Sequence, residues 1–173
     1  MTRLLLTALL ALSGCTGKSD NIKPVENFKT DRYLGTWYEI ARIDHRFEKG
    51  LSRVTAEYSM REDGGITVVN RGFSAADGTW KESVGKARFV DGKDKGHLKV
   101  SFFGPFYGAY VVFELDQTGY QYALVSGPDT SYFWLLSRTP EMDPALRERL
   151  LDSAVAKGFK RDDILLVDQS GQR

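Results

Sequence analysis

The sequence predicts an all-β protein: an eight-stranded up-and-down antiparallel β-barrel with one C-terminal α-helix packed outside it. Two observations predict this fold. From residue 33 to about residue 138, short runs rich in Val, Thr, Tyr, Phe and Trp alternate with turn residues, as in consecutive antiparallel strands. A single pattern of helical spacing then follows. Closing the eight strands into a barrel would remove the two exposed edges of an open sheet.

Each strand is predicted from a run of β-forming residues that ends at a turn. The turns carry Gly, Asp and Pro, as in Asp63-Gly64 and Asp77-Gly78, where tight connections are favoured. Because the connections are short, each strand is expected to pair with the next along the chain. The predicted strands span residues 36–43, 53–60, 65–73, 80–90, 96–103, 108–116, 120–126 and 132–138.

The C-terminal part predicts one helix and one short strand. Asp143 is a suitable N-cap, Pro144 suits the first helical position, and Gly158 ends the helix. Apolar residues at helical spacing form one stripe, which we expect to pack on the outer wall of the barrel. The residues of this stripe are Leu146, Leu150, Leu151, Ala154 and Val155. The apolar run 164–167 is expected to return to the sheet as a strand.

The N-terminus has the features of a lipoprotein signal peptide. An apolar run, 4–12, follows one positive charge and is shorter than the roughly 20 residues that span a bilayer. The string Leu12-Ser13-Gly14-Cys15 resembles the lipobox that lipoprotein signal peptidase cleaves before an acylated cysteine. Cys15 is the single cysteine of the chain. We therefore expect Cys15 to carry the lipid anchor.

The chain is accordingly divided into three parts. Residues 1–14 are predicted to be the signal peptide, and 15–32 a lipidated tether that ends in a cap around Val25 and Phe28. Residues 33–173 are predicted to form the barrel domain. A domain near 150 residues buries roughly 70% of its unfolded surface, enough to fold on one core without disulfides.

Charge and cysteine content argue against a nucleic-acid partner and against an intramolecular disulfide. The 173-residue chain has a formal net charge of +1, and removing 1–14 takes away Arg3 and no acidic residue. The mature chain is therefore close to neutral, so a nucleic-acid partner is not expected. A single cysteine cannot form an intramolecular disulfide. Membrane contact is expected to come from the lipid on Cys15, since two acyl chains suffice for stable anchoring.

Motifs at both ends of the barrel region resemble those of the lipocalin family. The first predicted strand contains Gly35 and Trp37 of a Gly-x-Trp motif, and the last ends at the family's arginine, Arg138. Asp116 falls where the family has Thr-Asp-Tyr, although only the aspartate is kept. The resemblance covers roughly 25–170 and implies structural roles for these residues. Trp37 would plug the closed end, with Arg138 stacked across its indole in a cation–π contact of about 0.5–2 kcal/mol.

Two further segments narrow the resemblance. Residues 99–107 and 122–125 are most similar to bacterial lipocalins, which are outer-membrane lipoproteins, and to their apolipoprotein D-like relatives. The residue after the cysteine is Thr16 rather than Asp, which in enteric-type bacteria implies the outer membrane. The resemblance therefore implies a lipid-anchored protein at the periplasmic face of the outer membrane.

A barrel of eight strands leaves room for one small ligand. Side chains alternate between the two faces of a strand, so if Trp37 points inward then Glu39 and Ala41 do too. If the predicted alternation of a strand is wrong by one residue, every side chain of that strand faces the opposite side of the sheet. The candidate ligand-binding residues are Glu39, Ala56, Tyr58, Val68, Asn70, Ala87, Phe89, Val100, Phe102, Tyr110, Trp134 and Leu136.

Such a lining is apolar and aromatic with few polar groups, which is typical of sites for lipophilic molecules. The resemblance implies a fatty acid or a lysophospholipid as ligand, and Glu39 and Tyr58 could contact its polar head. An aromatic group flanks a Gly-Pro turn and could gate entry or meet a partner; the resemblance makes a homodimer a further possibility. This group is Phe102, Phe103, Phe106, Tyr107 and Tyr110.

Two other classes of function stay open: a lipid-modifying or isomerising enzyme on the same barrel, and an envelope scaffold that binds a protein. No catalytic residue, metal site or cofactor is predicted. His45 and His97 lack the spacing of a zinc site, and we expect both to be solvated loop or strand-end residues. Ser126 does not lie in a nucleophile elbow. A scaffold would be expected to have a filled barrel.

Overall fold

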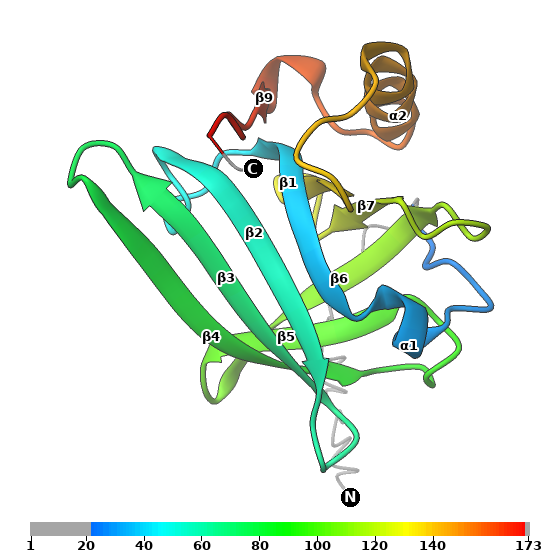
Figure 1. Cartoon of the computed structure of the whole chain (residues 1–173). Helices are drawn as coiled ribbons and strands as arrows, with labels where there is room; N and C mark the ends of the chain where they lie inside the picture. Colours follow the sequence, from blue (N-terminus) through cyan, green and yellow to red (C-terminus); the bar gives the residue numbers. More distant parts are fainter. Residues whose placement is uncertain (1–21, 172–173) are drawn as a thin grey trace, which may run out of the picture.

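The computed structural model describes residues 22–171 and shows a closed antiparallel barrel with α2 on its outer wall (Figure 1). This confirms the predicted fold, and the eight predicted strands differ from the observed ones by at most two residues at either end. The elements are α1 Thr30–Tyr33, β1 Gly35–Ile43, β2 Leu51–Met60, β3 Ile66–Ser74, β4 Thr79–Phe89, β5 His97–Phe103, β6 Phe106–Leu115, β7 Tyr122–Ser126, β8 Phe133–Ser137, α2 Pro144–Ala156, the 3₁₀-helix η1 Arg161–Asp163 and β9 Ile164–Leu166.

The strands follow one another around the barrel in chain order. The sheet order runs from β2 through β8 to β1 and β9, and an additional β1–β2 pairing closes the barrel. β1 pairs with β2 near its start, at Gly35 opposite Tyr58, and with β9 at its end, at Ile43 opposite Ile164. The first half of β1 therefore closes the barrel, and the second half carries the added strand β9.

Helix α2 has the predicted cap and the predicted position. The Asp143 carboxylate accepts a hydrogen bond from the Leu146 backbone N–H at 2.8 Å, which satisfies one of the free donors at the helix start. Leu150, Leu151 and Ala154 are fully buried against the outer face of the barrel, whereas Val155 is exposed. Packing of α2 outside the barrel is thus confirmed.

The protein has two apolar cores, one on each side of the barrel wall. The inner core lies within the barrel and includes Trp37, Tyr58 and Leu98. The outer core lies beneath α2 and includes Phe133 and Leu151. Strands β7 and β8 contribute to both cores, which explains why nearly all of their residues are buried.

A bulge in β1 changes which of its side chains face the interior. Glu39 lies opposite Leu136, yet Ala41 lies opposite the adjacent Leu135, so one extra residue is inserted at Ile40. The expectation that Ala41 points inward is therefore wrong: it packs in the outer core with Ile40. Arg42 takes its place on the inner side, where it contacts Glu39. Strand alternation alone cannot reveal such an insertion.

The described part of the N-terminal segment packs on the barrel before β1 begins. Ile22 is buried in the outer core, and the Val25 backbone donates to the Val112 carbonyl and accepts from the Gly96 N–H, both at 2.9 Å. Phe28 belongs to the inner core. The predicted signal peptide and the anchor Cys15 lie outside the described residues. Within 22–171, no α-helix has both the length and the hydropathy needed to cross a membrane.

Candidate functional site

The closed end of the barrel is sealed by Trp37 and Arg138. Trp37 has no exposed surface, and its Nε1 donates a hydrogen bond of 2.8 Å to the Tyr33 carbonyl. The Arg138 guanidinium carbon lies 3.9 Å from the centre of a Trp37 ring. Arg138 also donates to the carbonyls of Thr36, at 2.9 Å, and Arg32, at 2.7 Å. Burial lowers the pKa of Arg138, and the stacked guanidinium ties α1 to β1.

Gly35 and Asp116 shape the chain around this end. Gly35 has a φ of +90°, a conformation that favours glycine. The Asp116 carboxylate accepts backbone hydrogen bonds from Thr118, Gly119 and Gln121 at 3.1–3.2 Å, which fixes the turn between β6 and β7. Burial alone would raise the pKa of Asp116, but these three donors outweigh it and lower the pKa.

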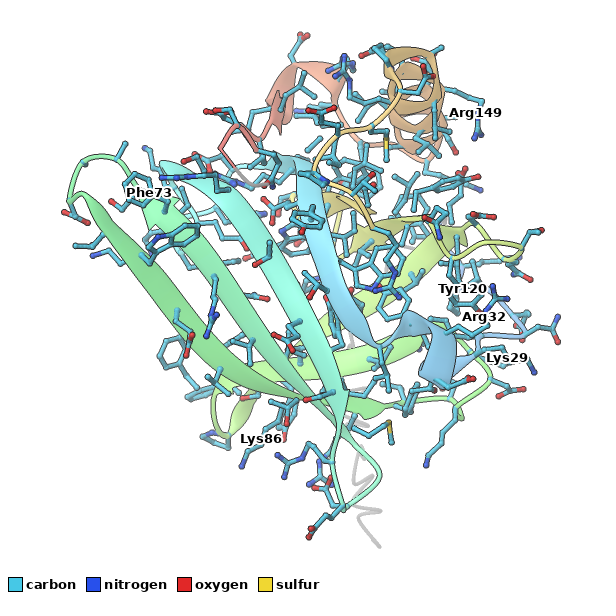
Figure 2. The ribbon with its side chains drawn as sticks, in the orientation of Figure 1. Lys29, Arg32, Phe73, Lys86, Tyr120 and Arg149 are labelled. Carbon is cyan, nitrogen blue, oxygen red and sulfur yellow. The ribbon has the colours of Figure 1, made fainter. Side chains whose placement is uncertain are left out.

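Residues from α1 pack onto the same turn. Figure 2 shows Lys29, Arg32 and Tyr120 close together at the closed end. The Lys29 backbone N–H donates to the Tyr120 hydroxyl at 2.9 Å, and the Arg32 guanidinium lies 4.3 Å from the Tyr120 ring centre. The N-terminal segment is thereby fixed across the closed end, so an interior ligand would have to enter from the opposite end.

A cavity of about 560 Å³ occupies the barrel interior. This volume lies within the range of about 300–1,000 Å³ that is usual for small-molecule sites. The structure places most of the candidate ligand-binding residues in its wall, from six strands. They are Glu39, Ala56, Tyr58, Val68, Asn70, Val100, Phe102, Tyr110, Trp134 and Leu136.

Two candidates do not line the cavity. Ala87 is buried in the inner core, and Phe89 packs edge-on against Phe28, with ring centres 6.5 Å apart. Both point inward as expected, but they lie towards the closed end, where side chains fill the barrel. Alternation along a strand indicates the face and not the depth. Ala87 and Phe89 are thus inner-core residues, whereas the other ten candidates line the cavity.

Three tyrosines separate the cavity from the sealed end. The hydroxyl of Tyr110 is hydrogen-bonded to those of Tyr33, at 2.7 Å, and Tyr58, at 2.8 Å. Tyr33 in turn packs on Trp37, with ring centres 4.9 Å apart. Burial raises the pKa of all three tyrosines, so they remain neutral. The floor of the cavity is thus polar but uncharged.

An acidic cluster beside the cavity joins two buried glutamates of its wall, Glu39 and Glu48, to the more exposed Asp44. Glu39 Oε1 accepts from Arg42 Nη1 at 2.8 Å, and Asp44 Oδ1 lies 3.1 Å from the same guanidinium. Glu48, from the loop between β1 and β2, accepts from Trp134 Nε1 at 3.0 Å. Burial raises the pKa of both Glu39 and Glu48. One oxygen of Glu39, which was predicted to reach a polar head, is thus already bound by Arg42, and the other is not.

A sequence profile of the lipocalin-like domain matches residues 28–169, which include the whole barrel and α2. The chain belongs to the lipocalin family. The match begins at Phe28 and ends at Gln169, whose side chain donates to backbone carbonyls of β1 and β2 at 2.7 and 2.9 Å. The matched region therefore begins at Phe28, within the predicted cap, and includes the whole barrel.

This lipocalin is similar to several named proteins over nearly its full length. It is 54% identical to the outer membrane lipoprotein Blc of Vibrio cholerae, covering 95% of this chain and 96% of that protein. It is 47% identical to outer membrane lipoprotein Blc of Escherichia coli, covering 95% and 94%. Apolipoprotein D of Mus musculus is 33% identical, covering 98% and 96%. The recognised resemblance to bacterial and apolipoprotein D-like lipocalins is thus confirmed.

Solved structures support the fold. Insecticyanin from the tobacco hornworm Manduca sexta superposes with a TM-score of 0.70 at 21% identity, covering 90% of this chain and 88% of that chain. A cockroach allergen, Per a 4, gives a TM-score of 0.64 at 23% identity, covering 84% and 90%. At these identities the likeness concerns the barrel alone.

The aromatic group predicted at the mouth of the lipocalin divides into two parts. Phe103 and Phe106 are each 79% exposed beside the turn between β5 and β6. Phe102 lies in the cavity wall, and Tyr110 belongs to the hydroxyl group at the floor. Tyr110 therefore lies deeper than Phe103 and Phe106, because β6 carries it inward from the mouth.

Loop residues of the mouth escaped prediction because loops have no strand periodicity. Phe47 and Glu48 precede β2, and Tyr132 precedes β8, yet all three line the cavity. His45 lies on the loop after β1, as expected, and is partly covered because it stacks on Tyr132 with ring centres 4.0 Å apart. His97 pairs with Asp91 at 2.6 Å. Within 22–171, no group of three His, Cys, Asp or Glu residues could hold a metal ion.

Proposed function

We propose that this lipocalin binds one single-chain lipid, a fatty acid or a lysophospholipid, in its barrel cavity and stores or transports it in the bacterial envelope. One observation carries the proposal: an interior cavity of about 560 Å³ that is sealed at one end and lined mainly by apolar and aromatic side chains. An acyl chain gains roughly 0.8 kcal/mol for each methylene that it buries in such a wall.

The membrane anchor supports this role. We propose that residues 1–14 are removed, that Cys15 carries acyl chains, and that the rest of 15–32 links it to the domain. The relatives named outer membrane lipoproteins support the outer membrane as its location, with the domain at the periplasmic face. An anchor of this kind would hold the cavity close to membrane lipids, which are the expected source of ligand.

Binding rather than catalysis is the better supported activity. Among the described residues that line the cavity, there is no cysteine or histidine, and Ser83 has no hydrogen bond to a base. The relatives above are named lipoproteins and apolipoproteins. A scaffold without a ligand would not need a cavity of this size. A homodimer could form through the exposed Phe103 and Phe106 and would be detected by analytical ultracentrifugation.

The proposal is tested with the full chain carrying Cys15→Ser, which removes the proposed acylation site. A neutral fluorescent probe, N-phenyl-1-naphthylamine, is bound and then displaced by palmitic acid or by palmitoyl lysophospholipids. Saturable displacement with one site per chain is expected. If neither lipid class displaces the probe from folded protein, lipid carriage is refuted.

A further inference from the structure

The acidic cluster beside the cavity has more carboxylates than cations. Glu39, Asp44 and Glu48 share one guanidinium, that of Arg42. Arg42 directs Nη1 to Glu39 and Nε to Asp44, and its Nη2 donates to the carbonyls of Glu48, at 2.9 Å, and Leu51, at 3.2 Å. The carboxylate of Glu48 therefore receives no guanidinium N–H, although it is in the same cluster.

Two carboxylate oxygens of this cluster are left for a ligand. Among the described residues, none donates a hydrogen bond to Glu39 Oε2 or to Glu48 Oε1. Both side chains line the cavity, while their residues are only 4% and 6% exposed. A buried carboxylate is costly unless it is paired and hydrogen-bonded. A cation would offset this cost: a primary ammonium through charge-assisted N–H donors, and a quaternary ammonium through its charge alone.

Aromatic rings line the same cavity as these two glutamates. Trp134, which holds Glu48 through its indole N–H, lines the cavity together with Tyr132 and Phe47. The ring centres of Tyr132 and Trp134 are 6.3 Å apart. Aromatic faces attract cations, and sites for ammonium groups commonly combine such rings with carboxylates. The carboxylates and the rings thus favour the same kind of ligand group.

The cations that line the cavity are already paired. Arg71 on β3 lies 2.6 Å from Glu82, and Lys81 on β4 lies 2.9 Å from Asp77. All four side chains are about half exposed, so solvent screens them. When Glu39 and Glu48 are ionised, they would repel an anionic head, and no nearby unpaired cation of the described wall offsets this repulsion.

We infer that Glu39 and Glu48, with Trp134 and Tyr132, form a subsite for the ammonium group of the bound lipid. The subsite would make a lysophospholipid with an ethanolamine or choline head a better ligand than a fatty acid or a lysophospholipid without an ammonium group. This inference rests on the proposed function, which it narrows to one class of headgroup.

The test compares palmitoyl lipids that differ only in their heads, by displacement of N-phenyl-1-naphthylamine from the full chain carrying Cys15→Ser. The lipids are lysophosphatidylethanolamine, lysophosphatidylcholine, lysophosphatidylglycerol and monopalmitoylglycerol. Either ammonium lipid is expected to bind about tenfold more tightly than lysophosphatidylglycerol, the difference that one ionic or cation–π contact of the ammonium group produces. Lysophosphatidylglycerol retains the phosphate and lacks the ammonium group, whereas monopalmitoylglycerol lacks both.

The decisive variant is Glu48→Gln, which keeps an oxygen acceptor for Trp134 and removes the charge. It is expected to abolish the preference for ammonium heads while changing the affinity for monopalmitoylglycerol by less than about twofold. Glu82→Gln is the matched control, because Glu82 also lines the cavity but is paired with Arg71 and about half exposed. This control should retain the preference.

The outcomes separate the inference from the proposed function. If none of the four lipids displaces the probe, lipid carriage itself fails. If all four bind with similar affinity, or if Glu48→Gln keeps the full preference for ammonium lipids, carriage stands and the ammonium subsite is refuted.

Discussion

Replacing Arg138 with Met tests whether the sealed end holds the barrel together. The change removes the cation–π contact with Trp37 and the hydrogen bonds to the carbonyls of Thr36 and Arg32. A partly desolvated cation–π contact contributes roughly 1 kcal/mol and each hydrogen bond about 1 kcal/mol net, so the expected loss of unfolding free energy is about 3 kcal/mol. Methionine retains much of the apolar stem, so the loss reflects the guanidinium.

The assay is urea unfolding followed by tryptophan fluorescence. Arg71→Met is the matched control, since Arg71 forms an exposed ion pair with Glu82, for which the expected loss is below about 1 kcal/mol. Arg138→Lys should fall between the two, because lysine keeps the charge but lacks the planar fork. If Arg138→Met and Arg71→Met have equally small effects, the sealed end does not stabilise the barrel as argued.

The remaining predictions concern the outer helix, the cavity and the acidic cluster. Leu151→Ala should lower the unfolding free energy by about 2–5 kcal/mol without changing lipid affinity, because Leu151 is fully buried outside the barrel; an equal effect of Val155→Ala would contradict this. Ala56→Trp should weaken lipid binding at least about tenfold by filling the cavity, whereas Glu57→Trp on the outer face should not; equal affinities would place the ligand elsewhere. Burial raises the pKa of Glu48, so this carboxyl ionises at a lower pH in the unfolded state than in the folded state. The free energy of unfolding of wild type therefore falls as the pH rises above the ordinary pKa of a glutamate. Glu48→Gln should therefore have a higher melting temperature than wild type at about pH 7.5 and the same melting temperature at about pH 4; a lower one at the higher pH would contradict the burial argument.

The sequence was sufficient for the fold because each of the eight barrel strands pairs with the next along the chain, and the turns between them carry Gly, Asp or Pro. The helix could be predicted as well, since Asp143, Pro144 and Gly158 mark its ends and its apolar stripe must be covered. Strand alternation also identified inward side chains such as Ala56, Tyr58 and Val100, which line the cavity.

The site was harder to predict for three physical reasons. The bulge at Ile40 inverts the second half of β1, which hid Arg42 and misplaced Ala41. Loops lack periodicity, so Glu48 could not be assigned to the cavity wall. Depth along the barrel depends on the tilt of each strand and on what fills the closed end, so Phe89 could not be distinguished from a ligand contact.

The most direct test of lipid carriage is native mass spectrometry of the full, lipid-anchored chain purified from its own membrane. Spectra are compared for wild type and for Ala56→Trp, with collisional activation to release and identify the bound molecule. Wild type is predicted to retain one single-chain lipid per barrel, and Ala56→Trp to lose it. Spectra showing the same empty barrel for both proteins would contradict the proposal that this cavity carries lipid.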